Sequence, residues 1–491
     1  MRQVHTPIEA AQWLQGRVRG QLHCDSRKVR PGDGFIAWPG AATDGRKHVA
    51  SALAQGATAC LVEHEGVDAF GFTQDAVASY GQLKAATGPI AAAYYGEPSQ
   101  ALQVLAVTGT NGKTSTAWWL AQALSAVPAN AWPSAVIGTL GTGRPPHVQS
   151  TGLTTPDPVL LQGQFRHFLD DGLKACAIEA SSIGIAERRL DGTQIAVAIF
   201  TNFTQDHLDY HGTMDAYWSV KDSLFRWPGL RAAVVNIDDA KGVELMTTLQ
   251  NSGLDLWPVS TEHAARLQAV DIGYGPQGLR FTVVEGAEHA QLATSVIGQY
   301  NVSNLLGVIG AMRAVGVPLQ AAVAACGELL PVPGRMERLA VDGKPLVAVD
   351  YAHTPDALDK ALQALRPLAA QRGGKLWCVF GCGGDRDPTK RPVMAAVAEK
   401  NADRVVVTSD NPRSEKPEAI ISQILLGLSH ADCVEVQADR ARAIAEIVAA
   451  AAATDVILLA GKGHEDSQEI AGVKHPFDDR VHARKALEAR P

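Results

Sequence analysis

The sequence has few aromatic residues, few cysteines, and no long apolar or basic run. Aromatic residues make up only 6% of the 491 residues, and the seven cysteines are scattered, with no Cys-x-x-Cys pair. This spacing argues against a disulfide framework, and Cys378 and Cys382, the closest two, are interpreted as reduced packing residues. No run of about 18 apolar residues occurs, and residues 1–16 contain no apolar stretch typical of a signal peptide. We therefore expect a cytoplasmic protein that does not insert into a membrane.

Basic residues do not outnumber acidic residues. The chain has 44 Lys and Arg against 51 Asp and Glu, so its formal net charge is −7. A nucleic-acid-binding protein concentrates basic residues in a patch or stripe, and no such run occurs here. We expect no nucleic-acid partner, and we interpret the negative charge as simple solubility. The protein is expected to be a monomer.

The length and composition indicate several α/β domains. At roughly 150 residues per domain, a chain of this length has about three domains. The 46 glycines suit layers in which tight turns join strands to helices. The expected divisions are 1–98, 99–334 and 335–491.

Apolar runs separated by helical stretches predict a small α/β domain followed by a larger parallel sheet. A helix at 48–56 and a strand at 57–65 represent the first domain, and 96–100 (GEPSQ) is expected to be a linker. Strands that alternate with helices form a parallel sheet with helices on both faces. The strands expected in the middle of the chain are 102–108, 174–181, 195–203 and 232–238.

The alternation restarts after 331–338 and predicts a Rossmann-like doubly wound C-terminal domain. Each of its expected strands is followed by a polar cluster, namely DYAHTPD, GCGGDRD, SDNPR and GKGHED. In open α/β sheets, ligands bind beyond the carboxyl ends of the strands. The clusters therefore predict a binding site at one edge of this sheet. The expected strands are 345–351, 375–381, 404–410 and 455–461.

A glycine-rich turn between the strand at 102–108 and the next helix predicts a phosphate site. Backbone N–H groups in such a turn cradle phosphate, and the helix N-terminus adds positive potential. Lys113 would reach the terminal phosphates, and the Thr114 hydroxyl could bind Mg²⁺. The loop is shorter than the usual P-loop, because Val107 stands where the first glycine would be, so a glycine turn with a chance lysine is the alternative. The expected nucleotide-binding residues are Gly109, Thr110, Asn111, Gly112, Lys113, Thr114 and Ser115.

Motifs along the whole chain resemble those of the Mur ligases and their folylpolyglutamate synthetase relatives. After T-G-T-N-G-K-T-S come E-A-S-S (179–182), T-N-F-T-Q-D-H-L-D-Y-H-G (201–212), N-V-S-N (301–304), G-R-M-E (334–337), D-Y-A-H-T-P-D-A-L (350–358) and G-K-G-H-E (461–465), in the family's order. D-S-R (25–27) and D-N-P-R (410–413) are similar to the branch that adds the third residue of the muramyl peptide. The family's arrangement implies a UDP-binding N-terminal domain, a central ATP-binding domain and a C-terminal amino-acid-binding domain.

The resemblance implies an ATP-dependent acid–amino-acid ligase that acts in peptidoglycan precursor synthesis. A substrate carboxylate would attack the γ-phosphate of ATP to give an acyl phosphate, and the amine of the incoming amino acid would then displace phosphate. The implied substrates are UDP-N-acetylmuramoyl-L-alanyl-D-glutamate and meso-2,6-diaminopimelate, with ATP and Mg²⁺ as cofactors.

The resemblance also implies a metal site and an unusual lysine. Thr114, Glu179 and His207 match metal ligands, with Lys113 and Lys221 completing the catalytic set. In this family the lysine at the position of Lys221 is carbamylated by CO₂, which turns a cation into an anion that can hold Mg²⁺ or the acyl phosphate. The alternatives are a solvated carboxylate for Glu179, a structural histidine for His207 and a surface helix lysine for Lys221.

Further residues match the family's nucleotide and muramyl-peptide contacts. The nucleotide contacts would be Asn301, Asn304, Arg335 and Asp350, with a helix cap as the alternative for N-V-S-N. The contacts to the UDP-sugar and peptide would be Ser26, Ala41, Ala42, Thr43, Thr154, Thr155, Ser182 and Arg189. The chain departs from the family at Ile183, which cannot hydrogen-bond, and at Glu187, which would repel a substrate anion unless a cation offsets it.

D-N-P-R is the motif that bears on which amino acid is added, because related ligases that add L-lysine usually lack its arginine. Arg413 could bind the distal carboxylate of diaminopimelate in a bidentate manner, with Arg386 as a second contact. Glu465 would accept from the distal ammonium. The alternative is a proline turn after a strand. The full set expected around the amino acid is Lys221, Arg386, Asp410, Asn411, Pro412, Arg413, Gly461 and Glu465.

Three rival functions are less consistent with these motifs. A folylpolyglutamate synthetase or a lysine-adding ligase would not need both D-S-R and D-N-P-R. A P-loop regulatory or motor ATPase would not need G-K-G-H-E in the second sheet. A UDP-sugar-binding module without catalysis would not keep Lys113, Glu179, His207 and Lys221 together.

Overall fold

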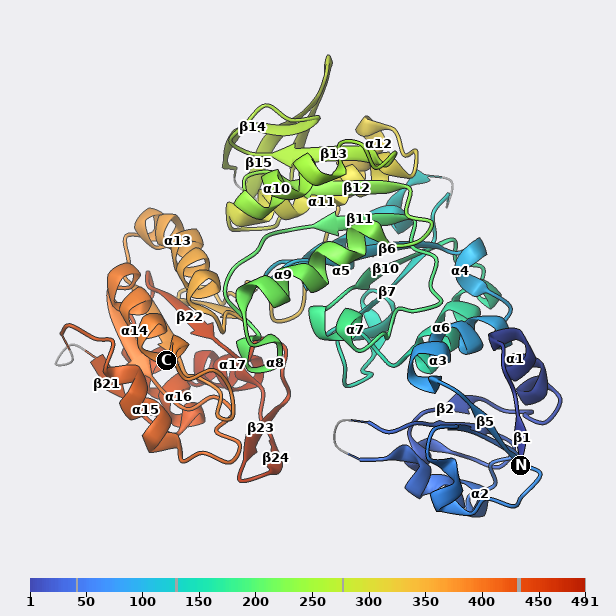
Figure 1. Cartoon of the computed structure of the whole chain (residues 1–491). Coiled ribbons are helices and arrows are strands. Elements are labelled where there is room, and N and C mark those ends of the chain that lie inside the picture. The colour runs from blue at the N-terminus through green and yellow to red at the C-terminus, as the bar shows by residue number, and fades with distance from the viewer. Residues whose placement is uncertain (41–42, 129–130, 276–277, 431–433, 491) are drawn as a thin grey trace.

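The computed structural model describes residues 1–40, 43–128, 131–275, 278–430 and 434–490. Its strands form sheets of five, eleven and six strands, followed along the chain by a two-stranded hairpin. Figure 1 shows three lobes: a blue N-terminal lobe, a central lobe that runs from cyan to yellow, and an orange-red C-terminal lobe. The α/β fold with three domains, expected from the sequence, is confirmed.

The N-terminal sheet is entirely parallel, in the order β1-β5-β4-β3-β2. Its strands are β1 (Arg2–Gln3), β2 (Leu22–His23), β3 (Gly34–Ala37), β4 (Ala59–Glu63) and β5 (Val77–Tyr80). Its helices are α1 (Pro7–Gln15), α2 (Val49–Ala54) and α3 (Leu83–Tyr94), with 3₁₀ turns at Ser26–Lys28, Gly45–His48 and Val67–Phe70. Apolar residues of α1 and α3 pack on one face of the sheet in the same cluster as Val159 of the central domain, so this lobe is anchored through its core.

The central sheet has the order β16-β15-β14-β13-β12-β11-β6-β10-β7-β8-β9. Its strands are β6 (Gln103–Thr108), β7 (Ser134–Gly138), β8 (Gly141–Arg144), β9 (His147–Gln149), β10 (Ala175–Glu179), β11 (Val197–Phe200), β12 (Ala232–Asn236), β13 (Asp255–Ser260), β14 (Leu267–Tyr274), β15 (Leu279–Glu285) and β16 (Glu288–Ala293). The strands from β7 to β14 in this order pair in parallel, whereas β8–β9 and β15–β16 extend the two ends with antiparallel pairs. The parallel core was expected, but these antiparallel extensions were not.

Helices cover both faces of this sheet, and strand β6 explains why. Leu105 and Val107 pack in a cluster with α5 and α11, whereas Val104 and Ala106 pack in the cluster with α6 and α10. Alternate residues of a strand point to opposite faces, so an apolar run is buried on both sides. The helices are α4 (Pro98–Ala101), α5 (Lys113–Ala126), α6 (Pro158–Asp170), α7 (Ser182–Ala186), α8 (Leu208–His211), α9 (Met214–Ser223), α10 (Ala240–Leu249), α11 (Tyr300–Ala314) and α12 (Leu319–Gly327), with a 3₁₀ turn at Leu224–Arg226.

The C-terminal sheet has the order β17-β18-β22-β19-β20-β21, and only the edge strand β17 is antiparallel. The strands are β17 (Glu337–Leu339), β18 (Leu346–Asp350), β19 (Leu376–Phe380), β20 (Arg404–Val407), β21 (Val434–Val436) and β22 (Val456–Ala460), followed by the hairpin β23 (Ser467–Ile470) and β24 (Val473–Pro476). The helices α13 (Pro355–Arg372), α14 (Lys390–Asn401) and α15 (Pro417–Leu425) cover one face, and α16 (Arg440–Ala450) and α17 (Asp479–Ala489) cover the other. This is the doubly wound domain that the sequence predicts.

The structure refines several local expectations. The sequence at 96–100 was expected to be a linker, but α4 begins within it at Pro98, so the division at 98/99 falls inside a short helix. The division at 334/335 falls between α12 and β17. Cys378 and Cys382 are buried free thiols, as expected. Among the described residues, no helix combines the length and apolar character needed to cross a bilayer.

Candidate active site

The glycine-rich loop lies between the carboxyl end of β6 and the first turn of α5, where the sequence predicts it. Gly109 has φ of 146° and Gly112 has φ of 85°, a region that side chains disfavour. A Cβ atom at Gly109 would lie 1.9 Å from Thr201 Oγ1, and one at Gly112 would lie 2.4 Å from Asn304 Oδ1. Both positions therefore require glycine, as expected for a tight turn whose backbone N–H groups face a ligand.

The loop is held in shape by the T-N-F-T segment, a role that sequence reasoning missed. The Asn111 N–H donates to Asn202 Oδ1 at 2.9 Å, and Asn202 Nδ2 donates back to the Asn111 carbonyl at 3.0 Å. Thr201 Oγ1 donates to the same carbonyl at 2.6 Å. Thr110 Oγ1 donates to the Thr204 carbonyl at 3.0 Å. These bonds preorganise the loop, because its polar backbone atoms are already fixed.

Two lysine side chains converge on one carbonyl oxygen of this loop. Lys113 Nζ donates to the carbonyls of Gly109 and Thr110 at 2.9 and 2.8 Å, and Lys221 Nζ donates to Gly109 at 2.7 Å. Lys221 comes from α9, is 1% exposed, and lies over the Tyr217 ring. Burial, together with the charge of Lys113, holds the pKa of Lys221 well below its ordinary value. The alternative of a surface helix lysine is therefore wrong.

Glu179, at the end of β10, is buried beside the loop. Its Oε2 accepts from Thr114 Oγ1 at 2.9 Å, and its Oε1 accepts from the Thr139 N–H at 2.8 Å. With 1% of its surface exposed, it is not the solvated carboxylate that the alternative reading describes. A hydroxyl and a carboxylate side by side are the hard oxygen donors that Mg²⁺ prefers, so the residues present fit this ion.

His207 lies in the loop before α8, next to Asp206. Its Nε2 is 3.5 Å from Asp206 Oδ2, and its φ of 52° is unusual for a residue other than glycine. Burial, reinforced by the charges of Lys113 and Lys221 and opposed by Asp206, lowers the pKa of His207 to about 4. The ring is therefore neutral near pH 7, which is the form that can bind a metal. Within the described residues, no hydrogen bond or ion pair joins it to Glu179.

The four residues expected to contact the muramyl peptide lie in a connected patch beside Glu179. Thr155 Oγ1 donates to the Glu179 carbonyl at 2.7 Å, and Arg189 Nη1 donates to the Thr155 carbonyl at 2.9 Å. Thr154 Oγ1 is 3.0 Å from Thr139 Oγ1. Ser182 Oγ is 3.0 Å from His211 Nε2. The patch thus links α7, α8 and the segment before α6.

Glu187, the departure that raised a question of repulsion, has a cation beside it. Lys84 Nζ of α3 donates to Glu187 Oε2 at 2.8 Å, and the Tyr210 hydroxyl donates to Oε1 at 2.5 Å. The Lys84 hydrogen bond is the main cause of the lowered pKa of Glu187. The carboxylate is therefore engaged within the protein, and the contact also joins the N-terminal lobe to the central domain.

The nucleotide-binding residues expected outside the glycine-rich loop lie in two places, namely helix α11 and the start of the C-terminal domain. Asn301 and Asn304 are buried inside α11, where Asn304 Nδ2 donates to Asn301 Oδ1 at 2.9 Å. The N-cap of this helix is Gln299, so the helix-cap alternative is wrong. Arg335 reaches the glycine-rich loop, with Nη2 3.3 Å from Thr114 Oγ1. Asp350, at the end of β18, accepts from the Met336 N–H at 2.7 Å, and burial raises its pKa.

The residues expected to bind the amino acid gather at the carboxyl edge of the C-terminal sheet. Asn411 Nδ2 donates to Glu465 Oε2 at 2.7 Å, although 54 residues separate them. Arg413 Nη1 donates to the Gly384 carbonyl at 2.6 Å, and its Nε is 3.9 Å from Glu469. A Cβ atom at Gly461 would lie 2.4 Å from Asp410 Oδ2, so the backbone must pass close to that carboxylate. Pro412 lies in the same buried turn, between Asn411 and Arg413.

Other expected residues lie apart from this cluster. Arg386 is half exposed, and its Nη1 is 3.8 Å from Asp209 Oδ2 of α8. Ser26 begins a 3₁₀ turn in the N-terminal lobe, and Thr43 is exposed on the same lobe. Ala41 and Ala42, expected in the uridine-binding loop, lie outside the described residues.

The C-terminal domain contacts the glycine-rich loop directly. Asn111 Nδ2 donates to Asp356 Oδ2, in the first turn of α13, at 2.9 Å. Together with the contacts of Arg335 with Thr114 and of Arg386 with Asp209, this bond brings the edges of the two large sheets face to face. Figure 1 shows α8 of the central lobe beside the red C-terminal lobe.

Two buried cations of the C-terminal domain were missed by sequence reasoning. Lys462 contacts Asn411 and Glu465. Arg391 binds Glu415 through two nitrogen atoms and the Gly383 carbonyl through one, which ties together the loops that carry Arg386 and Arg413. Lys462 stands in the quoted G-K-G-H-E motif, and Asn411, 51 residues away in the chain, is the partner that the motif alone does not indicate.

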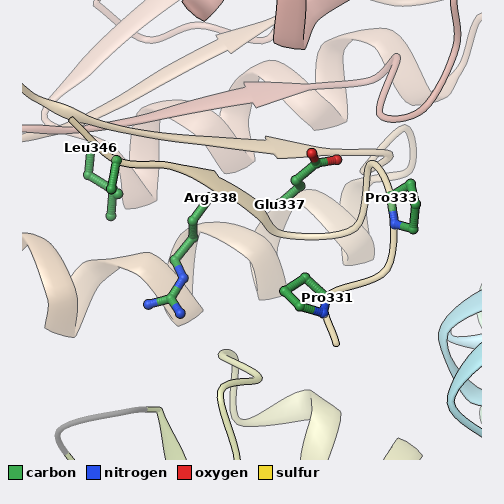
Figure 2. A pocket seen from close by; sticks show the side chains of 6 residues that line it. Pro331, Pro333, Glu337, Arg338 and Leu346 are labelled. Atoms are coloured by element: carbon green, nitrogen blue, oxygen red, sulfur yellow. The ribbon is translucent and has the colours of Figure 1, made fainter. Parts of the chain in front are cut away.

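A separate pocket of about 550 Å³ lies on the segment that enters the C-terminal domain. Figure 2 shows its prolines on the connection before β17, and Glu337 and Arg338 on that strand. None of the expected site residues lines it. The lining residues are Pro331, Pro333, Glu337, Arg338, Ala340 and Leu346.

The central domain carries a phosphate loop on a parallel sheet, and this loop faces a doubly wound domain with a polar cluster at its strand ends. Together these features define a three-domain P-loop enzyme. Family models match over most of the chain: the Mur ligase family catalytic domain at 21–96, the Mur ligase middle domain at 107–312 and the Mur ligase glutamate ligase domain at 334–463. The chain belongs to the Mur ligase family.

Individual relatives agree with this assignment. A protein of Acidovorax sp. (strain JS42), named UDP-N-acetylmuramoyl-L-alanyl-D-glutamate–2,6-diaminopimelate ligase, is 63% identical over 486 residues, covering 98% of this chain and 97% of that protein. A solved structure with the same name is 35% identical at a TM-score of 0.65, covering 96% and 94% of the two chains. The MurF ligase of Thermotoga maritima, solved in complex with ADP, shares the fold at 16% identity and a TM-score of 0.66, covering 97% and 98%.

Proposed function

We propose that the chain joins meso-2,6-diaminopimelate to UDP-N-acetylmuramoyl-L-alanyl-D-glutamate, with cleavage of ATP to ADP and phosphate through an acyl phosphate. The observation that carries this proposal is the bond between Asn411 and Glu465, which unites D-N-P-R and G-K-G-H-E into one site for an amino-acid head. That site belongs to the domain whose Arg335 reaches Thr114 of the ATP loop. The name of the Acidovorax relative supports the same substrates.

In the first step, the glutamate side-chain carboxylate attacks the γ-phosphorus, and ADP leaves. Lys113 exchanges its bonds to the carbonyls of Gly109 and Thr110 for phosphate oxygens, and Arg335 neutralises charge that develops on the transferred group. Asn301, Asn304 and Asp350 contact the nucleotide. The muramyl peptide lies along Thr154, Thr155, Ser182 and Arg189, and Ser26 and the loop 41–43 bind its UDP part.

Thr114 and Glu179 would hold Mg²⁺, with neutral His207 as a further ligand. When bound, the ion screens the two anions that must meet and orients the phosphate oxygens. Glu179 already has Thr114 and Thr139 as partners, so its carboxylate is oriented before any ion arrives. The direct carboxylate–hydroxyl contact is what supports this assignment.

Lys221 acts as a carbamate. Its neutral amine attacks the carbon of CO₂ and releases one proton, giving an N-carboxylate that carries one negative charge. Two ammonium groups on a single Gly109 carbonyl repel each other, and burial already disfavours the charged form of Lys221. The conversion replaces that repulsion with attraction to Lys113, and the new carboxylate is a further oxygen ligand.

In the second step, the amine of diaminopimelate attacks the acyl carbon, phosphate leaves, and the amine loses a proton. Arg413 and Arg386 bind the distal carboxylate, and Glu465 accepts from the distal ammonium, with the turn of Asp410, Pro412 and Gly461 as a backbone frame. The enzyme is a cytoplasmic monomer with domains at 1–98, 99–334 and 335–491.

Phosphate release tests this proposal. Wild type is assayed with UDP-N-acetylmuramoyl-L-alanyl-D-glutamate and ATP, with and without meso-diaminopimelate, beside Lys113→Ala as a folded variant without the phosphate contact. Release that requires both substrates, with a matching amide product and none from Lys113→Ala, supports the proposal. Equal use of L-lysine, or full release by the variant, would contradict it.

A further inference from the structure

One fully buried ammonium group lies inside the amino-acid site, and the mechanism above does not use it. Lys462 has an exposed side-chain fraction of 0%. It follows β22 and stands between Gly461 and Gly463, whose φ values of 112° and 52° turn the chain in a way that side chains disfavour. A buried lysine is costly unless it is paired, so its partners indicate what it is for.

The three N–H donors of Lys462 are all used. Its Nζ donates to Asn411 Oδ1 at 3.1 Å, to Glu465 Oε2 at 3.0 Å and to the Ser467 carbonyl at 2.7 Å. An ammonium group has three donors and no acceptor. Two of the three bonds therefore go to side chains that the proposed function assigns to the incoming amino acid.

These bonds fix which way the Asn411 amide faces. Its Oδ1 accepts from Lys462 and from the Glu469 N–H at 3.0 Å, and its Nδ2 donates to Glu465 Oε2 at 2.7 Å. A rotated amide would direct its NH₂ group at an ammonium and at a backbone N–H, with no acceptor for either. Lys462 and the Glu469 N–H together exclude the rotated form.

The same bonds determine which atoms remain for a ligand. Glu465 Oε2 is filled by Lys462 and Asn411, whereas Oε1 accepts no hydrogen bond from any described residue. The second N–H of the Asn411 amide also has no acceptor within the described part of the chain. One acceptor for an ammonium and one donor for a carboxylate thus lie side by side.

We propose that Lys462 is a positioning residue that selects a zwitterionic amino-acid head by orienting Asn411 and Glu465. This inference rests on the proposed function. Lys462 also sets the charge of the site, because it is the ion-pair partner of Glu465, whereas Glu469 faces Arg413 at 3.9 Å. Without that balance the site would be more anionic, which favours a side chain that ends in an amine alone over one that also carries a carboxylate.

Steady-state kinetics of Lys462→Met tests the proposal. The Michaelis constant for meso-diaminopimelate is expected to rise about tenfold or more, as when hydrogen bonds to charged groups are lost. The constants for ATP and for the muramyl dipeptide substrate should stay within about twofold, since uniform binding at those sites is untouched. The ratio of kcat/KM for diaminopimelate over L-lysine should fall. Lys462→Gln keeps a donor for Asn411, so we expect a smaller shift in the same direction.

Controls separate a positioning role from a purely structural one. Lys485→Met changes an exposed lysine of α17 in the same domain and should behave as wild type. Circular dichroism reports the folded fraction, and Lys462→Gln carries the test if the methionine variant does not fold. A fall in kcat alone, an equal rise of all three Michaelis constants, or an unchanged preference in a folded variant would overturn the inference. If wild type makes no amide with diaminopimelate but does so with another amino acid, the proposed function is overturned instead, and the role of Lys462 is decided by the constant for that amino acid.

Discussion

At the scale of single residues, each charged side chain of the site lies against a specific partner atom. Lys113 and Lys221 share the Gly109 carbonyl, Glu179 holds Thr114, and Glu187 is neutralised by Lys84. Sequence reasoning could place Lys113 and Glu179 near one another, because each stands in a motif at a strand end, whereas Lys221 of α9 was linked to them by the family resemblance. It could not find Lys84, since nothing in the local sequence of α3 indicates that it faces Glu187.

The carbamate at Lys221 gives the first residue-scale prediction. Lys221→Ala should lower kcat by about 10²-fold or more, as when a preorganised charge is removed from an active site. Short carboxylates such as formate or acetate should restore part of the rate, because the vacated space lies beside the Gly109 carbonyl that Lys113 also contacts. Lys174→Ala, an exposed lysine of the same domain, is the matched control. In wild type, ¹³C NMR in labelled bicarbonate should show a carbamate signal that Lys221→Ala lacks; the same signal in both proteins would refute the assignment.

Arg413 gives the second residue-scale prediction. The distal carboxylate of diaminopimelate is absent from lysine, so lysine would leave the guanidinium without its partner. Arg413→Ala should raise the Michaelis constant for diaminopimelate strongly, with a loss of roughly 1.5–3 kcal/mol in binding, and leave that for ATP nearly unchanged. Arg386 is half exposed, so its contribution should be smaller. Amide formation with each amino acid is the measurement, with Arg404→Ala at the exposed start of β20 as control. A mutant that keeps the full preference over lysine would exclude Arg413 as the selector.

At the scale of elements, the burial of a strand influenced whether it could be predicted from the sequence. The strands of the parallel cores are apolar on both faces, so β6, β10, β11, β12 and the inner C-terminal strands were found from the sequence within a few residues. Strands β14–β16 have exposed residues on one face and interrupted apolar runs, and they were not found. The polar clusters at strand ends were located because sheet topology brings strand ends together. The clamp of Thr201 and Asn202 on the ATP loop needed the three-dimensional register of β11 beside β6.

A buried ion pair connects the helices that support the amino-acid site, and it gives a stability prediction. Arg440, at the start of α16, makes two bonds with Asp479, at the start of α17, and a third with the Ala460 carbonyl that ends β22. Both side chains are 0% exposed. Asp479→Ala leaves a buried cation unpaired and should cost about 3–5 kcal/mol in the free energy of unfolding.

The matched control is an exposed ion pair within α16, the helix that carries Arg440. Glu446→Ala breaks the exposed pair between Arg442 and Glu446 and should cost at most about 0.5 kcal/mol. Denaturant unfolding, together with hydrogen exchange of β22 to follow the C-terminal domain, measures both variants. Equal stability loss in the two variants would mean that burial does not determine the strength of the Arg440 pair.

At the scale of the whole molecule, the reaction requires two domains to meet. The ATP loop belongs to the central sheet and the amino-acid site to the C-terminal sheet, so the acyl carbon and the amine approach only when these edges face each other. The structure has such contacts already, through Asn111 with Asp356 and Arg335 with Thr114. Polar side-chain contacts, such as those of Gln205 with Asp387 and of His353 with Asp206, join the two domains, and polar contacts are typical of domain interfaces that rearrange during turnover.

The last prediction concerns this movement and rests on Asp356. Its carboxylate accepts from Asn111 inside the ATP loop, so occupancy of the loop and position of the C-terminal domain should be coupled. Single-molecule distances between labels on α10 and α16 should shorten and narrow when ATP, the muramyl dipeptide and diaminopimelate are all bound. Asp356→Ala should broaden the distribution without ligands, because one bond between the domains is lost, whereas Asp356→Asn keeps an acceptor oxygen and should stay close to wild type. The substrates should still narrow the distribution of Asp356→Ala, since their own contacts bridge the domains. Distances that do not change with all substrates bound would refute domain closure, and identical distributions for wild type and Asp356→Ala would show that closure does not depend on Asp356.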